Sequence, residues 1–331
     1  MPITGNATYI PTMNEFAAHW GQCNTALAPG ALVIQLPDNS TMTRAQFTTL
    51  RDTVQTAQFT VQDRLVDQQI ARGAIQLQKQ PLLERFNQFT GKLDAKFRRT
   101  PFHDARPKAP SLRGGQLAFT QPLVEALKLW AKINAAPAPP GVTLPLLLAD
   151  GTTQSAFASA VAALQFAYAT EKDAAQNTAL ARSVRDQEQA RAYTVMKAYR
   201  ETVPPDLAMH PALVETLPRL TPLPGHTPAA VNASGVFVAP DQARVVYGAS
   251  EDAALLHYQL RGTVGEDYDE DDAVALATRG PEEAREFLTK FGLGQPGARI
   301  ALKVYVILTT GNEAGGAALR VERPLAIPIA A

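Results

Sequence analysis

The 331-residue sequence predicts a multidomain protein: an elongated, mainly α antiparallel helical bundle with an internal duplication and a small β element, followed by an all-β sandwich. Three observations predict it. One motif occurs twice, long segments carry helical apolar spacing, and the last third breaks into short β-prone runs. The chain therefore divides into a duplicated helical part and a β part.

The repeated motif begins at a tryptophan and ends at a phenylalanine, and the separation between these two residues is the same in both copies. A duplication of this length is typical of one scaffold built from two similar halves. Each copy predicts a helix, a short strand with a polar turn, and a long helix, and residues 31–37 of the first copy fit either a strand or half of a hairpin. By pseudo-twofold symmetry, we expect the two strands to pair with each other. The matched residues are Trp20 and Trp130, Asn24 and Asn134, Phe47 and Phe157, and Ala71-Arg72 and Ala181-Arg182.

Apolar residues at spacings of three and four predict the helices in order along the chain. After Thr43 these spacings continue without proline until Pro81, which is typical of the seam of a helical bundle. Because proline lacks the N–H that a helix interior needs, we expect one helix to end there and another to begin. The predicted helices cover residues 12–27, 43–80, 82–97, 117–134 and 157–203.

Two proline-rich stretches mark the expected domain boundaries. The first is also basic, and the second is followed by a change to β-prone composition. The expected organisation is a first helical copy with its short strand at 1–97, a basic Pro/Gly linker at 98–116, a second helical copy at 117–203, a Pro-rich linker at 204–227, and a β-sandwich with an apolar tail at 228–331.

Seven short β-prone runs between residues 235 and 321 are typical of a two-sheet sandwich. Their order resembles a fibronectin type III domain, an immunoglobulin-like sandwich, over about 228–324. The residues that carry the resemblance are Pro296-Gly297, Ile300, Leu302, Val304, Tyr305, Gly311-Asn312-Glu313 and Val321-Glu322-Arg323-Pro324. Tyr247 stands at the family's core tryptophan, Tyr258 matches a core aromatic, and Ile300 replaces the corner tyrosine. The resemblance implies a structural or binding role rather than catalysis.

Charge is balanced overall and divided along the chain. Only 19% of residues are charged and the net charge is zero, so bulk charge does not indicate a nucleic acid or an anionic membrane as partner. Residues 222–331 hold 14 acidic and 9 basic residues, a net of −5, which leaves +5 on the rest of the chain. Opposite charges on two parts of one chain favour head-to-tail contact between copies.

No catalytic signature is present in the sequence, and no cofactor is predicted. In the acidic run 266–272, Asp267, Asp269 and Asp271 form a weak Ca²⁺ candidate, because Asp272 stands where a calcium loop of the EF-hand type needs glycine. A solvated loop between strands is the preferred interpretation, so no metal site is predicted. The five histidines include no pair at metal-ligand spacing. In the first helix, His19 is expected to have a packing or capping role, and Cys23 is expected to be a small buried apolar residue.

Two segments are candidate interfaces. The basic linker carries Arg98, Arg99, Arg106 and Lys108, with aromatic residues interleaved. Such a loop can contact phosphates, but a solvated loop or a contact with an acidic protein surface is expected more often than nucleic acid. The apolar tail carries Leu325, Ile327 and Ile329 at alternate positions, and we expect it to close its own sandwich or to dock on another copy.

The sequence shows no signal peptide and no apolar run long enough to span a membrane, so a cytoplasmic location is the default expectation. Export by a dedicated machine would leave no mark of this kind. We expect a non-enzymatic structural protein that self-assembles into a larger homo-oligomer or filament through its bundle, sandwich and tail. The alternative is an adhesion or adaptor module that binds a protein or glycan through sandwich loops and is spaced by a helical stalk.

Overall fold

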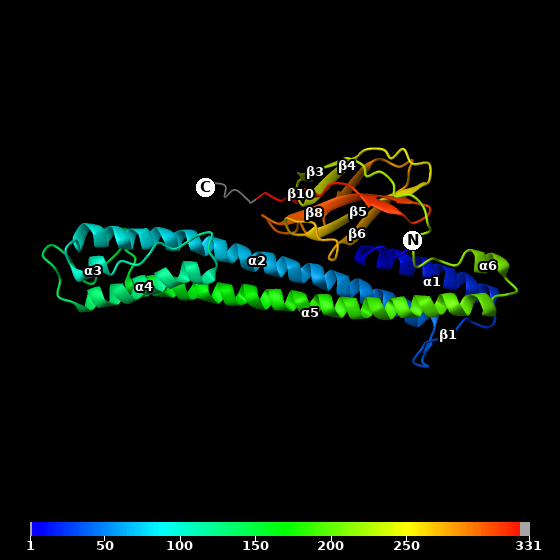
Figure 1. Ribbon diagram of the computed structural model, residues 1–331, viewed down its shortest axis with the longest axis horizontal. Coiled ribbons are helices and arrows are strands. Elements are labelled where there is room, and N and C mark those ends of the chain that lie inside the picture. Colours follow the sequence, from blue (N-terminus) through cyan, green and yellow to red (C-terminus); the bar gives the residue numbers. More distant parts are fainter. Residues whose placement is uncertain (1, 325–331) are drawn as a thin grey trace. The chain divides into compact units, whose positions relative to one another are not determined.

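The computed structural model describes residues 2–324 and contains a helical region and a β-sandwich (Figure 1). The chain forms two compact units. The sandwich unit comprises residues up to Val66 together with those from Asn177 onward, and the helical unit comprises Asp67–Gln176. Each unit therefore contains part of both long helices, and the divisions do not coincide with the predicted boundaries between the copies.

The two long helices match each other in length and position. Helix α2 covers Arg44–Lys96 and α5 covers Gln154–Asp206, so each has 53 residues, and the two begin at equivalent positions of the repeated motif. The preceding helices are α1 over Tyr9–Ala26 and α4 over Gln116–Ala135. The short helices are η1 at Asn6–Thr8, α3 at Pro101–Asp104 and α6 at Pro211–Glu215.

The predicted break at Pro81 is wrong, because α2 continues through this proline. Ile75 before it and Leu82, Phe86 and Phe89 after it are all buried in one apolar cluster of the helical unit. Proline removes one backbone hydrogen bond, and the burial of a continuous apolar face on both sides outweighs that loss. Helix α5 likewise includes Pro204 and Pro205 in its last turn.

The predicted pairing of strands from the two copies is also wrong. Strand β1 at Ile34–Gln35 pairs with β2 at Thr41–Met42, within the first copy. A tight turn joins them, and the Leu36 N–H donates to the Ser40 carbonyl at 2.8 Å. A hairpin this short satisfies its backbone locally.

The tryptophan motif builds the same local geometry twice. The Trp20 Nε1–H donates to the Leu32 carbonyl at 3.1 Å, and the Trp130 Nε1–H donates to the Leu146 carbonyl at 3.0 Å. Each tryptophan ring contacts the phenylalanine of its own motif, with ring centres 5.7 Å apart for Phe47 and 5.9 Å apart for Phe157. Each unit therefore has an apolar core around one copy of the motif.

The sandwich consists of two antiparallel sheets. One sheet has the order β3-β4-β7, from Ala233–Val238, Gln242–Tyr247 and Glu286–Thr289. The other has the order β10-β8-β5-β6, with β9 also paired to β8, from Leu319–Glu322, Arg299–Leu308, Leu255–Val264, Val274–Arg279 and Glu313–Gly315. Each of the seven predicted runs overlaps a strand, and β9 is additional. Tyr247 and Tyr258 lie in the core with ring centres 4.8 Å apart.

Candidate functional site: an arginine–aspartate junction

The acidic loop between β5 and β6 places one buried carboxylate at the surface of the sandwich. Asp269 Oδ1 accepts a hydrogen bond from the Asp271 N–H at 2.9 Å, which folds the loop back on itself. The next residue, Asp272, has a side chain only 2% exposed. A carboxylate buried to this degree needs cationic or hydrogen-bonding partners.

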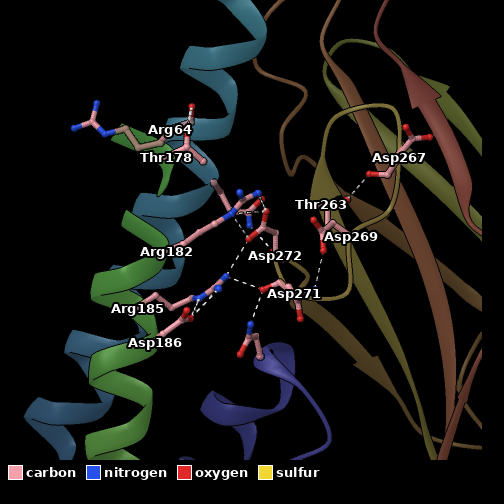
Figure 2. A network of polar contacts seen from close by, with 12 residues as sticks. Arg64, Thr178, Arg182, Arg185, Asp186, Thr263, Asp267, Asp269, Asp271 and Asp272 are labelled. Carbon is pink, nitrogen blue, oxygen red and sulfur yellow. Dashed lines mark hydrogen bonds and ion pairs between the residues drawn. The ribbon is translucent and has the colours of Figure 1, made fainter. Parts of the chain in front are cut away.

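Two arginines on α5 supply those partners (Figure 2). Arg182 Nε donates to Asp272 Oδ1 at 3.0 Å, and its Nη2 donates to Oδ2. Arg185 Nη1 donates to Asp272 Oδ1 at 3.0 Å and to the Asp271 carbonyl at 2.6 Å. The two arginines are three residues apart, so both project from one side of the helix.

The charges at this junction differ in burial. The Arg185 side chain is 5% exposed and also pairs with Asp186 at 2.9 Å, whereas the Arg182 side chain is 41% exposed. Its hydrogen bonds to Asp272 raise the pKa of Arg182 above its usual value. Arg185 and Asp272 are both buried, so the loss of either one leaves the charge of the other desolvated and lowers the stability of the fold.

Amide side chains satisfy the carbonyl groups of the same loop. Asn6 Nδ2 donates to the Asp271 carbonyl at 2.6 Å, and Gln62 Nε2 donates to the Asp272 carbonyl at 2.6 Å. Gln58 Nε2 in turn donates to the Asn6 carbonyl at 2.7 Å, which fixes the segment before α1. The junction thus joins the loop to α2, to α5 and to the segment that precedes α1.

A polar pocket of about 530 Å³ lies beside the junction. Gln189 lines it with its Nε2 buried and without a hydrogen-bond partner among the described residues. Residues 2–324 contain no group of three or more His, Cys, Asp or Glu side chains arranged to hold a metal ion. The polar lining and the buried Gln189 amide can accommodate a small polar group through hydrogen bonds. Its other charged or polar lining residues are Asn6, Tyr9, Arg182, Arg185, Asp186, Asp269 and Asp271.

A second polar cluster covers the outer face of β5 and β8. Arg261 lies 3.9 Å from the centre of the Tyr305 ring and pairs with Glu313, with Nη1 2.9 Å from Oε1. The Tyr305 hydroxyl donates to Glu270 at 2.6 Å. Burial acts to raise the pKa of Glu270, but hydrogen bonds from Tyr305 and Lys303 outweigh it and hold this pKa below its usual value.

A third cluster is buried between α1 and α5. His19 Nδ1 lies 2.7 Å from the Tyr199 hydroxyl, and Nε2 lies 2.8 Å from the Leu213 carbonyl. The tautomer with hydrogen on Nε2 donates to Leu213 and accepts from Tyr199. Burial raises the pKa of Cys23, which is opposite to what a nucleophilic thiolate needs. The expected packing roles of His19 and Cys23 agree with this geometry.

The residues of the calcium candidate have separate roles in the structure. Asp267 pairs with Arg320 at 2.6 Å, Asp269 accepts from its own loop, and Asp271 contributes its carbonyl to the junction. Sequence reasoning missed Asp272, the residue that misfits a calcium loop. The recurrence of Arg72 as Arg182 was visible in the sequence, but no local pattern indicated its partner.

The predicted interface residues have separate surroundings. Arg98, Arg99 and Lys108 are exposed, and Arg106 pairs with Asp94 at 2.8 Å. Leu325, Ile327 and Ile329 lie outside the described residues. Between residues 2 and 324, no helix has the length and apolar character that crossing a bilayer requires.

Comparisons with known proteins give partial likenesses. No family model and no curated protein matches the chain. Among solved structures, a Fn3-like protein from Clostridium thermocellum is 15% identical over 30% of this chain and 96% of its own, with a TM-score of 0.25. The fn3 domain of human contactin 1 is 15% identical over 34% and 89%, with a TM-score of 0.26. Pectate lyase PelI from Erwinia chrysanthemi is 13% identical over 28% of each chain, with a TM-score of 0.24.

Proposed function

We propose that this chain is a non-enzymatic structural protein that assembles with further copies of itself. In this proposal, a duplicated antiparallel helical framework carries an immunoglobulin-like sandwich of the fibronectin type III kind. The strand order supports the second part, because β6 pairs with β5 rather than with β7. In constant-type immunoglobulin domains the fourth strand belongs instead to the sheet of the first, second and fifth strands.

The observation that carries the proposal is the way buried polar groups are used. Asp272 is neutralised by Arg182 and Arg185, and His19 is held by Tyr199 and the Leu213 carbonyl. These groups connect segments of the chain that are far apart in the sequence. These groups stabilise the fold by joining distant segments, whereas a catalytic group must remain accessible to a substrate.

The structure also bears on how copies would meet. The net charges of the two parts of the chain predicted head-to-tail contact, but Asp272 already pairs with α5 of its own chain. Several large apolar side chains are exposed instead, including Leu180 at 65% and Leu288 at 55% in the sandwich unit. We therefore attribute assembly to apolar contacts, which salt screens far less than ion pairs.

Light scattering after size-exclusion chromatography, combined with electron microscopy, tests the proposal. We expect a mass above that of the 35.6 kDa chain, rising with protein concentration and persisting in high salt. A monodisperse monomer at high concentration, without particles or filaments in micrographs, would contradict it.

The polar pocket favours a second candidate, a module that binds a protein or glycan. Asp269 and Asp271 at its rim belong to a sandwich loop, and polar side chains of this kind recognise hydroxyl-rich ligands. A glycan array probed with the full chain tests this function. Binding that is lost in Asp271→Ala and retained in Asp267→Ala, which lies outside the pocket lining, would support it; no binding to any glycan would contradict its glycan form.

A further inference from the structure

The two sheets of the sandwich differ in how their outer faces are covered. On the sheet of β5 and β8, outward residues such as Gln259 and Thr263 are 0% and 1% exposed. On the sheet β3-β4-β7, the outward residues alternate with more deeply buried ones and are exposed or half-buried. We call this second surface the bare sheet face. It comprises Ser234, Val236, Val238, Gln242, Arg244, Val246, Glu286 and Leu288.

The bare sheet face carries four aliphatic side chains around one ion pair, with Ser234 and Gln242 beside them. Register places Val236 beside Arg244 and Arg244 beside Leu288, so the arginine is flanked by apolar side chains on both strands. Arg244 Nη2 lies 2.6 Å from Glu286 Oε2. Val236 is 57% exposed and Leu288 is 55% exposed. Several large aliphatic residues clustered on one exposed sheet face are typical of an interaction surface.

We propose that the bare sheet face is a twofold interface with a second copy of this chain. The inference rests on the proposed self-assembly and names the surface that performs it. A twofold interface brings the same patch together with itself, so the patch must be complementary to itself. An adjacent cation and anion meet this requirement, because the rotation places Arg244 of each copy against Glu286 of the other.

Charge also selects the occupant. The patch has no net charge, so a strongly basic or acidic partner would leave one member of the Arg244–Glu286 pair facing a like charge. A second copy supplies both charges in register and aliphatic side chains around them. Burial of the valines and Leu288 provides the attraction, and the exchanged ion pairs fix the orientation.

A matched pair of substitutions tests the surface. Leu288→Asp places an unpaired carboxylate in the interface, whereas Leu256→Asp makes the same change at a 43% exposed leucine of β5 in the other sheet. We expect Leu288→Asp to raise the dissociation constant more than about 100-fold and Leu256→Asp to leave it near that of the unchanged protein. Thermal unfolding of both variants checks that they fold.

Charge reversal shows whether Arg244 and Glu286 meet across copies. Arg244→Glu presents only acids at the centre of the face, and Glu286→Arg presents only bases, so each variant alone is expected to lose the twofold contact. An equimolar mixture of the two is expected to form a heterodimer. Failure of the mixture to associate would overturn the pairing. If the unchanged chain assembles and Leu288→Asp assembles to the same mass, this surface is wrong while self-assembly stands; a monomeric unchanged chain overturns both.

Discussion

The two copies of the tryptophan motif have the same frame and different core residues. When Trp20 is matched to Trp130, His19, Cys23 and Tyr199 in the sandwich unit correspond to Leu129, Ile133 and Phe89 in the helical unit. Both tryptophans contact the aromatic residue at this position, with ring centres 4.9 Å apart for Tyr199 and 5.2 Å apart for Phe89. One copy therefore has hydrogen-bonding groups where the other is apolar.

The polar residues of the first copy hold the part of the chain that comes after α5. His19 accepts a hydrogen bond from the Tyr199 hydroxyl and donates one to the Leu213 carbonyl of α6. Arg185 donates to Asp272 in the acidic loop of the sandwich. The position equivalent to Arg185 in the helical unit is Ile75, which is buried in an apolar cluster. The polar anchors of the duplicated scaffold therefore lie in the unit that also contains the sandwich.

The carboxylate partners of the equivalent arginines give the largest expected contrast. Asp272→Ala removes the buried carboxylate that pairs with Arg182 and Arg185 and leaves Arg185 only the exposed Asp186 as a carboxylate partner, so we expect a loss of about 3 to 5 kcal/mol in the free energy of unfolding. Glu171→Ala removes the partner of Arg72, whose side chain is 64% exposed, and should cost less than about 1 kcal/mol. Denaturant unfolding measures both. Equal losses would show that the Arg72 and Arg182 ion pairs contribute equally to stability, which would contradict the contrast.

The aromatic position gives the next contrast. Tyr199→Phe removes the hydroxyl that donates to His19, and Phe89→Tyr buries a hydroxyl in an apolar core. Each should destabilise its unit by about 1 to 3 kcal/mol. Hydrogen exchange resolved by peptide shows which unit loses protection. Adding Leu129→His to Phe89→Tyr should recover part of the loss, and no recovery would break the correspondence between the two cores.

The sequence predicted most of this frame because helical spacing and alternation are local. The helical segments and the strand runs follow from patterns within about 20 residues. The duplication was visible because the motif at Trp20 recurs at Trp130. The continuity of α2 through Pro81 was not visible, since it depends on buried contacts of Ile75 and Phe86 with other helices. Half of a hairpin was one expectation for residues 31–37, and β1 pairs with β2 in this way, but symmetry favoured a sheet between copies.

The junction could not be predicted for a different reason. Asp272 lies about 90 residues from Arg182, and the acidic run contains five other carboxylates of similar local character. Which one becomes buried depends on how the loop docks on α5. The one informative signal was that Arg182 repeats Arg72, and sequence alone shows no partner for either.

Acid should affect the sandwich unit through Glu270. Its pKa in the folded protein lies below the usual 4.5, so its stabilising contribution is present above about pH 4.5 and is lost as pH falls through the lower folded value. Hydrogen exchange at pH 6 and pH 3 should show β8 losing protection in acid, with a smaller change in Glu270→Gln. An unchanged pH dependence in that variant would assign the acid sensitivity to other carboxylates.

The polar turns should give the smallest effects, and equal ones. Asp38 accepts the Ser40 N–H at 2.9 Å, and Asp150 accepts the Thr152 N–H at 3.0 Å. Hydrogen bonds from the side chains of Ser40 and Thr152, and then from their N–H groups, lower the pKa of both carboxyls, and both turns are exposed. Asp150 also pairs with Arg85 at 3.5 Å, but an ion pair this exposed adds little. Asp38→Ala and Asp150→Ala should therefore lower protection in their own units slightly and to nearly the same degree. Clearly unequal losses would mean that the two copies differ in their turns as well as in their cores, although neither His19 nor Arg185 contacts a turn.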